Sequence, residues 1–267
     1  MTAQTRTEIA ALLARHNLSP SHRLGQHFLA DGNITRKIVD LAEVRQGDPV
    51  VEVGAGTGTL TVALARAGAS VVAYEIDSGL RPVLEEVTAG LDVELRMVDA
   101  MRVDFANELD GRTWKMVANL PYNVGTPLLL DALRDANQIT RFVIMVQREV
   151  GERLVARPGG KEYGLPSVVA GIHTRGTIAF RVPPQVFYPA PGVESAVVVL
   201  DRIDAPESAE RAIEIASYGF GQRRKMLRRS LSAVFDDPVS KLEMAGIDPT
   251  ARAEDLTPAD YVRLAST

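Results

Sequence analysis

The feature that most constrains the fold is an apolar segment, residues 48–54, that runs directly into a glycine-rich turn. The segment reads Asp-Pro-Val-Val-Glu-Val-Gly and predicts a strand buried on both faces. Gly54, Gly56 and Gly58 follow, and glycine permits positive φ and close approach of a ligand to the backbone. Helical spacing over residues 60–67 comes next. A strand, glycine turn and helix in this order predict an α/β fold that holds an electron-rich ligand at the start of the helix.

Two acidic residues flank this turn and narrow the class of ligand. A second apolar run, residues 70–74, ends at Glu75, about 20 residues after Gly54, where a carboxylate commonly binds ribose hydroxyls. The pyrophosphate fingerprint G-x-G-x-x-G is not met, because Thr59 stands where its third glycine should be. Glu52, two positions before Gly54, together with G-x-G-x-G resembles the first motif of class I S-adenosylmethionine (SAM) methyltransferases. By itself the turn leaves a dehydrogenase and a methyltransferase both open.

Asp99 is a third acidic candidate for the same site. Residues 93–98 predict a third strand, and Asp99 follows it directly. Its carboxylate can accept a hydrogen bond from an adenine amino group. The alternative is that Asp99 caps a short helix beginning near Met101. In a chain that already carries Glu52 and Glu75 in order, the cofactor role is favoured.

The tetrapeptide Asn119-Leu120-Pro121-Tyr122 indicates the chemistry. It follows a fourth predicted strand, residues 114–118, at the sheet edge where ligands of open α/β sheets bind. An aromatic amine is a poor nucleophile, and the Asn119 side-chain oxygen and the Leu120 carbonyl can both accept from its N–H groups. Pro121 holds the turn rigid, and Tyr122 offers a stacking face worth about 1–3 kcal/mol to a base. The pattern predicts methyl transfer to a base amine by alignment of nitrogen, methyl carbon and sulfur. A plain strand-to-helix turn is the alternative.

Seven segments, in the same order along the chain, resemble the ribosomal RNA adenine N6,N6-dimethyltransferase family in its KsgA/RsmA branch. They are GQHFL (25–29), VEVGAGTGTLT (51–61), NLPYNVGTP (119–127), VQREVGERL (146–154), PGGKEYG (158–164), FYPAPGVESAVV (187–198) and FGQRRKMLR (220–228). The match runs nearly end to end.

This resemblance implies a Rossmann-like class I SAM-dependent methyltransferase, with a mostly parallel seven-stranded sheet and a small C-terminal all-helical domain. It implies dimethylation of two adjacent adenosines in the 3′-terminal hairpin loop of 16S ribosomal RNA, within an immature 30S subunit. The implied cofactor-binding residues are His27, Leu29, Glu52, Gly54, Gly56, Glu75, Asp99 and Asn119. The implied catalytic residues are Asn119, Leu120, Pro121, Tyr122 and Phe187, the last as a second aromatic face on the target base. An ordinary buried phenylalanine is the alternative for Phe187.

The chain departs from the family pattern at a few positions. His27 replaces a common asparagine, and an imidazole can also donate to the cofactor's carboxylate. Ala55 and Gly125 replace the commoner proline and serine, and Pro166 stands where serine or threonine is usual, which leaves the local helix start open.

The net charge of −4 is unexpected for an RNA-binding enzyme. A local basic run nevertheless lies within residues 223–229, and no acidic residue occurs from 217 to 235. On a helix, Arg224 would share a face with Arg228, and Lys225 with Arg229. A solvated helix face is the alternative to phosphate contact. The residues expected to bind RNA are Arg223, Arg224, Lys225, Arg228, Arg229 and, in a weaker group, Arg148.

The composition bounds the remaining expectations. The chain has 267 residues, 46% hydrophobic and 24% charged, with no run long enough to span a membrane and no basic-then-apolar leader, so we expect a cytoplasmic protein. Without cysteines and with four scattered histidines, no metal site is expected. We expect a monomer. The expected domains are residues 1–200 for methyl transfer, with 1–29 covering the cofactor, a linker at 201–207, and a helical RNA-binding domain at 208–267.

Three alternative functions remain. One is a 23S rRNA adenine N6-methyltransferase of the macrolide-resistance type, which the long match over residues 146–164 disfavours. Another is a DNA adenine methyltransferase, for whose target-recognition domain the chain has no room. The last is a non-catalytic ribosome assembly factor on the same fold, which the intact Glu52, Glu75, Asp99 and Asn119 disfavour.

Overall fold

The computed structural model describes residues 4–122 and 124–267; Asn123, part of one motif quoted above, lies outside the described residues. The chain divides into two compact units. The first holds residues 1–151 and 177–201, and the second holds residues 152–176 and 202–267. The sequence-based boundary assigned 152–176 to the methyltransferase domain, whereas in the structure these residues group with the second unit.

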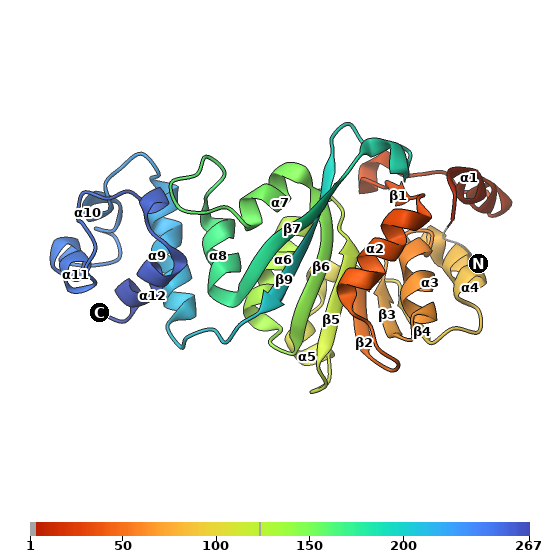
Figure 1. The fold of residues 1–267 in the computed structure, drawn as a ribbon, viewed down its shortest axis with the longest axis horizontal. Coiled ribbons are helices and arrows are strands. Elements are labelled where there is room, and N and C mark those ends of the chain that lie inside the picture. Colours follow the sequence, from red (N-terminus) through yellow and green to blue (C-terminus); the bar gives the residue numbers. More distant parts are fainter. Residues whose placement is uncertain (1–3, 123) are drawn as a thin grey trace. The chain divides into compact units, whose positions relative to one another are not determined.

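The first unit is built on a seven-stranded sheet with the order β4-β3-β2-β5-β6-β9-β7 (Figure 1). Its strands are β2 (Pro49–Val53), β3 (Ser70–Tyr74), β4 (Val93–Arg96), β5 (Trp114–Asn119), β6 (Ile139–Gln147), β7 (Thr174–Val182) and β9 (Ser195–Arg202). β2 is parallel to β3 and β5, β3 to β4, and β5 to β6, whereas β9 is antiparallel to β6. The predictions of seven strands and of one antiparallel strand are therefore confirmed.

Helices complete the first unit. They are α1 (Arg6–Arg15), α2 (Gly32–Ala42), α3 (Thr59–Arg66), α4 (Arg81–Thr88), α5 (Phe105–Glu108), α6 (Gly125–Asp135) and the start of α7 (Arg148–Leu154), whose residues from Glu152 onward belong to the second unit. In Figure 1, α2 and α3 lie in front of the strands, and α5 and α6 lie behind them. Because strands covered on both faces must be apolar on both faces, β2 and β5 read as short apolar runs rather than as alternating patterns.

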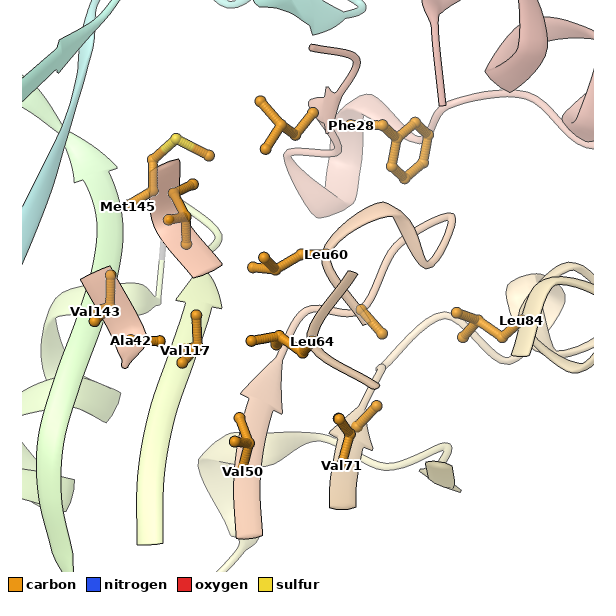
Figure 2. Close-up of a cluster of buried hydrophobic side chains, with 14 of the residues drawn as sticks. Phe28, Ala42, Val50, Leu60, Leu64, Val71, Leu84, Val117, Val143 and Met145 are labelled. Carbon is orange, nitrogen blue, oxygen red and sulfur yellow. The ribbon is translucent and has the colours of Figure 1, made fainter. Parts of the chain in front are cut away.

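A cluster of aliphatic side chains joins the sheet to these front helices (Figure 2). Val50, Val71, Val117 and Val143 come from four different strands and point to the same side of the sheet. They meet side chains of α3, including Leu64, and all are buried. Burial of each such side chain contributes about 1.5–3 kcal/mol to the stability of the fold. This layer therefore fixes the position of α3, and of the glycine turn that precedes it, against the sheet.

The second unit is helical. It contains α8 (Leu165–His173), α9 (Ala209–Gly221), α10 (Leu227–Ser230), α11 (Pro238–Met244) and α12 (Pro258–Ala265). Tyr163 donates to the Leu256 carbonyl over 2.7 Å, and Gly159 N donates to the Glu254 carbonyl over 2.8 Å. These bonds attach the segment before α8 to the C-terminal helices. Pro166 lies in the first turn of α8, where a missing N–H costs nothing.

The basic run does not form the continuous helix expected from the sequence. α9 ends at Gly221, and the four-residue α10 begins only at Leu227. The backbone between them is not helical, because it pairs with residues near position 251 instead. Leu227 N donates to the Ala251 carbonyl over 2.8 Å, and Met226 forms a β-bridge with Arg252. Arg224 and Arg228 therefore do not share one helix face.

Among the described residues no helix has the length and apolar character needed to cross a bilayer.

Candidate active site

A pocket at the carboxyl ends of the parallel strands gathers nearly all the predicted cofactor-binding and catalytic residues. Of these it is lined by His27, Leu29, Glu52, Gly54, Gly56, Glu75, Asp99, Asn119, Leu120, Pro121 and Tyr122. They come from β1 (Phe28–Leu29) and the segment before it, and from the ends of β2 through β5. Side chains far apart in the sequence meet here because the carboxyl ends of parallel strands share one edge of the sheet.

The glycine turn is a backbone surface shaped for close approach. Gly54, Gly56 and Gly58 have φ of 79°, 58° and 79°, which side chains adopt only with strain. A Cβ on Gly56 would lie 2.9 Å from the Phe28 ring. Gly54 N donates to the Tyr74 carbonyl over 2.8 Å, which ties the turn to the neighbouring strand. The turn is therefore fixed in place and leaves no room for larger residues.

Glu75 supports this turn from the end of β3. Its Oε2 accepts from Gly56 N over 2.8 Å and its Oε1 accepts from Asp77 N over 2.9 Å. Burial raises the pKa of Glu75, and these backbone hydrogen bonds oppose the rise. Each oxygen retains a lone pair that can accept from a ligand hydroxyl.

Glu52 is the most deeply buried carboxyl group of the site. Only 1% of its surface is exposed, and burial, with a smaller contribution from the Glu75 carboxylate, raises its pKa to about 8. Thr61 is the nearby residue that most opposes this rise. Neither the Thr61 hydroxyl nor Glu52 Oε2 has a hydrogen-bond partner among the described residues. A buried acid with a free oxygen is suited to a cationic ligand, whose charge would compensate ionisation.

Asp99 is a capping residue that also lies at the pocket. Its Oδ1 accepts from Met101 N over 3.0 Å and caps a 3-10 turn, Ala100–Arg102. The same residue lines the pocket. The apolar side chains of Ile76, Val98 and Met101 line this end of the pocket and are 50%, 46% and 39% exposed. A planar apolar ligand would cover them.

Asn119 has a defined amide orientation. Its Nδ2 donates to the His27 carbonyl over 3.2 Å, so its Oδ1 is the atom left to accept from a ligand. Leu120 is buried, and its N–H donates to the Met145 carbonyl over 3.0 Å, which holds the start of the tetrapeptide against β6.

Tyr122 is held from two sides. The imidazole of His27 stacks on its ring with centroids 5.6 Å apart and planes inclined by 28°. Its hydroxyl shares a 2.7 Å hydrogen bond with the hydroxyl of Ser195. His27 Nδ1 in turn lies 2.8 Å from the Pro189 carbonyl. Burial raises the pKa of Tyr122, so its hydroxyl stays protonated.

Phe187 does not line the pocket. It belongs to β8 (Phe187–Tyr188), which pairs antiparallel with β1, and its side chain is fully buried in the hydrophobic core. The alternative considered above, a buried phenylalanine, describes this position. The pairing of β1 with β8 holds the N-terminal segment beside the site. A hydrogen bond from Gln4 Nε2 to the Thr57 carbonyl, 2.8 Å long, attaches this segment to the glycine turn.

The expected RNA-binding residues fall into two groups. In the first group, Arg223 forms an ion pair with Glu254 at 2.7 Å, and Arg148 forms one with Glu194 at 3.0 Å. Arg223 thus has an acidic partner that is distant in sequence, although no acidic residue lies near it in the basic run. The other group, which we term the basic quartet, is Arg224, Lys225, Arg228 and Arg229. Its side chains are exposed and, within the described residues, form no ion pair closer than 4.0 Å. The pKa of Asp248 is lowered mainly by hydrogen bonds from Thr250, with a smaller contribution from Arg228.

Comparison with known proteins decides the family. The pattern described as "Ribosomal RNA adenine dimethylase" matches residues 17–267. The chain belongs to the ribosomal RNA adenine dimethylase family. As a member it is an rRNA adenine dimethyltransferase on a class I methyltransferase fold.

Individual relatives cover almost the whole chain. "Ribosomal RNA small subunit methyltransferase A" of Phenylobacterium zucineum is 43% identical over 269 residues, which span 99% of this chain and 94% of that protein. The protein with the same name from Leifsonia xyli is also 43% identical, over 97% of this chain and 96% of its own length. In structure, the 23S rRNA methyltransferase ErmE is similar with a TM-score of 0.69 and 26% identity, covering 90% of this chain and 98% of its own.

A dimethyladenosine transferase from Plasmodium falciparum shares the fold, with a TM-score of 0.77 and 24% identity over 89% of this dimethyltransferase and 96% of its own chain.

Sequence reasoning missed several residues in or beside the pocket of this dimethyltransferase. Ser195 stands in a motif noted above, but its partner Tyr122 is 73 residues away in the chain, and no local pattern signals that contact. Gln26 was also not singled out, although it lines the pocket and its Nε2 donates to Asp77 over 2.7 Å. The exposed apolar residue Ile76 follows the predicted strand 70–74, and Val98 is the last residue of the predicted strand 93–98; these positions were their only signal.

Proposed function

We propose that this enzyme uses SAM to add two methyl groups to N6 of each of two adjacent adenosines in the 3′-terminal hairpin loop of 16S rRNA. Its substrate is an immature 30S subunit in the cytoplasm, and it acts as a monomer. The observation that carries the proposal is a single pocket lined by Asn119, Glu52, Glu75 and Asp99, in which the Asn119 Nδ2 is engaged by the His27 carbonyl and Oδ1 is left to accept. Relatives named for the small ribosomal subunit support the choice of RNA.

The residues present fit SAM. When bound, SAM supplies a methyl group on a positively charged sulfur. Glu52, buried with an unpartnered oxygen, would compensate the cationic end of the ligand. Glu75 would accept from the ribose hydroxyls and Asp99 from the adenine amine, with Ile76 and Val98 against the purine faces.

His27 and Leu29, beside the amino-acid end of the pocket, would complete the cofactor site. His27 Nδ1 is engaged with the Pro189 carbonyl, so Nε2 is the ring atom available to a carboxylate. Gly54 and Gly56 would bring the backbone within reach of the ligand, since their positive φ values keep side chains out of this surface.

The nucleophile is prepared by acceptors rather than by a base. Asn119 Oδ1, fixed by the bond from Nδ2 to the His27 carbonyl, would accept one N–H of the adenine amine, and the Leu120 carbonyl the other. Two such bonds favour a pyramidal nitrogen whose lone pair is available. Pro121 restricts the backbone between these acceptors. Most of the acceleration would come from alignment of the reacting atoms.

The target base would stack on Tyr122, a contact worth about 1–3 kcal/mol. Phe187 would supply a second aromatic face only after leaving the core position that it occupies here. The basic quartet would contact phosphates, with Arg223 and Arg148 contributing less because each already has a carboxylate partner.

A second candidate function is methylation of 23S rRNA, which the likeness to ErmE favours. A direct test is transfer of radiolabelled methyl from SAM to 30S particles that lack the modification, beside 50S particles and duplex DNA. We expect label on 30S alone, with four methyl groups per particle by mass spectrometry of the digested RNA. Label on 50S would favour the second candidate, and no label on any substrate would overturn the enzymatic proposal in favour of an assembly factor.

A further inference from the structure

A hydrogen bond between Tyr122 and Ser195 lies behind the pocket and has no part in the mechanism above. The two hydroxyl oxygens are 2.7 Å apart. Ser195 is fully buried, and it does not line the pocket, so it touches neither cofactor nor base. Its effect on a reaction can therefore only pass through Tyr122.

Ser195 is a rigid point of attachment. It is the first residue of β9, opposite Gln147 in the antiparallel ladder with β6. Sheet hydrogen bonds and burial fix its backbone, and a buried hydroxyl strongly favours a partner. Tyr122, by contrast, lies in the connection between β5 and α6, outside regular structure. The bond thus ties a loop residue to the sheet.

The other support of Tyr122 comes from a different part of the chain. His27 stacks on the ring and is itself held by the Pro189 carbonyl at 2.8 Å. Pro189 precedes Ser195 in the loop between β8 and β9. The hydroxyl end and one face of the ring are therefore both fixed by this loop and its neighbours, so the ring cannot turn about its side-chain torsions without breaking at least one of these interactions.

We propose that Ser195 is a positioning residue whose hydroxyl, through Tyr122, sets the plane against which the target adenine stacks. His27 backs one face of the ring, so the base takes the opposite face. This inference rests on the proposed function, because it assigns the flipped adenine to Tyr122. Loss of the bond would let the ring adopt other rotamers and would misplace the amine relative to the methyl group, a kind of error that lowers rate more than binding.

The test is a double-mutant cycle with Ser195→Ala and Tyr122→Phe. Each variant removes the same bond from opposite ends, and Tyr122→Phe keeps the stacking ring. We expect each to lower kcat for methyl transfer to unmodified 30S particles by about 5- to 20-fold, and the double variant to be no slower than either single variant. The KM for SAM and the affinity for the particle should stay within about twofold. Ser195→Thr, which restores a hydroxyl, should recover activity.

Ser230→Ala is the matched control. Ser230 is also fully buried, and among the described residues its hydroxyl donates only to a nearby carbonyl, that of Leu227. This variant should lose stability without a change in kcat. Multiplicative losses in the double variant, or unchanged kcat in Tyr122→Phe, would overturn the positioning role. If Ser195→Ala lowered SAM affinity and melting temperature together with kcat, Ser195 would have a structural role and the positioning role would be overturned. Wild-type protein that does not methylate 30S particles would instead refute the proposed function.

Discussion

At the scale of single residues, the site is organised by side chains whose hydrogen-bonding capacity is partly committed to the backbone. Asn119 donates to the His27 carbonyl, Glu75 accepts from Gly56, and Asp99 accepts from Met101. Asn119 keeps its side-chain oxygen for a ligand, and the carboxylates of Glu75 and Asp99 keep lone pairs that can accept. Such fixed acceptors need little rearrangement during reaction, which is the physical basis of electrostatic preorganisation.

Replacement of Asn119 tests the acceptor role. Asn119→Ala removes the oxygen that accepts from the target amine, and we expect kcat to fall about 100-fold or more. SAM affinity, measured by calorimetry, should change much less. Asn107→Ala, at an exposed asparagine outside the pocket, is the control and should keep full activity. An active Asn119→Ala enzyme would contradict the assignment.

Glu52 should make the stability of the ligand-free protein depend on pH. Its folded-state pKa of about 8 lies above its usual value of 4.5, so the folded state retains a proton that the unfolded chain loses. The cost is absent below about pH 4.5, grows as the pH rises, and is complete above about pH 8. Glu52→Gln cannot ionise and should escape this cost.

Urea denaturation at several pH values measures the effect. The stability advantage of Glu52→Gln over wild type should widen by up to about 1.4 kcal/mol per pH unit between pH 5 and 8. The same variant should bind SAM more weakly, since it cannot compensate a positive charge. Parallel stability curves for the two proteins would show that Glu52 is not buried in its protonated form.

At the scale of elements, the glycine turn between β2 and α3 joins the sheet to the cofactor site. Its conformation depends on tertiary packing as well as on glycine. Phe28 of β1 packs against Gly56, and β1 is itself paired with β8. The turn, the N-terminal segment and the loop before β9 therefore form one connected structure around the pocket.

Substitution of three glycines by alanine separates the effect of positive φ on stability from the effect of packing against Phe28. Gly56→Ala combines a positive φ with a Cβ 2.9 Å from the Phe28 ring, Gly90→Ala has positive φ in open space, and Gly111→Ala has neither. A positive φ costs about 1–2 kcal/mol for alanine. In denaturant titrations we expect a larger loss of stability than this for Gly56→Ala, about that loss for Gly90→Ala, and almost none for Gly111→Ala. Only Gly56→Ala should weaken SAM binding, and equal losses at positions 56 and 90 would contradict the packing of Phe28 on the turn.

At the scale of the whole molecule, an acidic protein is proposed to bind a polyanion. The net charge of −4 is compatible with RNA binding because the basic side chains are unevenly distributed. Many of them are paired with carboxylates within the protein, whereas the basic quartet is exposed. The two compact units divide these tasks, with the pocket in the first and the quartet in the second. Binding through few phosphates should be local and sensitive to salt.

A double substitution in the quartet tests this division. Arg228→Ala with Arg229→Ala should weaken binding to 30S particles and reduce the slope of log affinity against log salt by roughly 0.7–0.9 for each phosphate that the variant no longer neutralises. SAM affinity should not change. Arg81→Ala is the control, since Arg81 lies in the first unit and is about half exposed beside Glu85. An unaltered salt slope would exclude the quartet from phosphate binding.

The sequence by itself determined the order of strands and helices and most of the pocket. Apolar runs, Gly54 to Gly58 and the acidic residues at strand ends predicted the sheet and its ligand edge, because local periodicity and the shared edge of parallel strands suffice for that inference. Pro166 was left open by the sequence, and the structure places it in the first turn of a helix.

Only the tertiary structure decided which distant side chains meet. The Ser195–Tyr122 bond, the pairing of β1 with β8, the ion pair of Arg223 with Glu254 and the interrupted basic helix all join segments far apart in the chain. Hydrophobic periodicity reports which face of an element is buried but not which partner covers it. Interactions between remote segments are set by the packing of the whole unit, so their chemistry, including the buried state of Phe187 and the raised pKa of Glu52, could not be derived from local sequence.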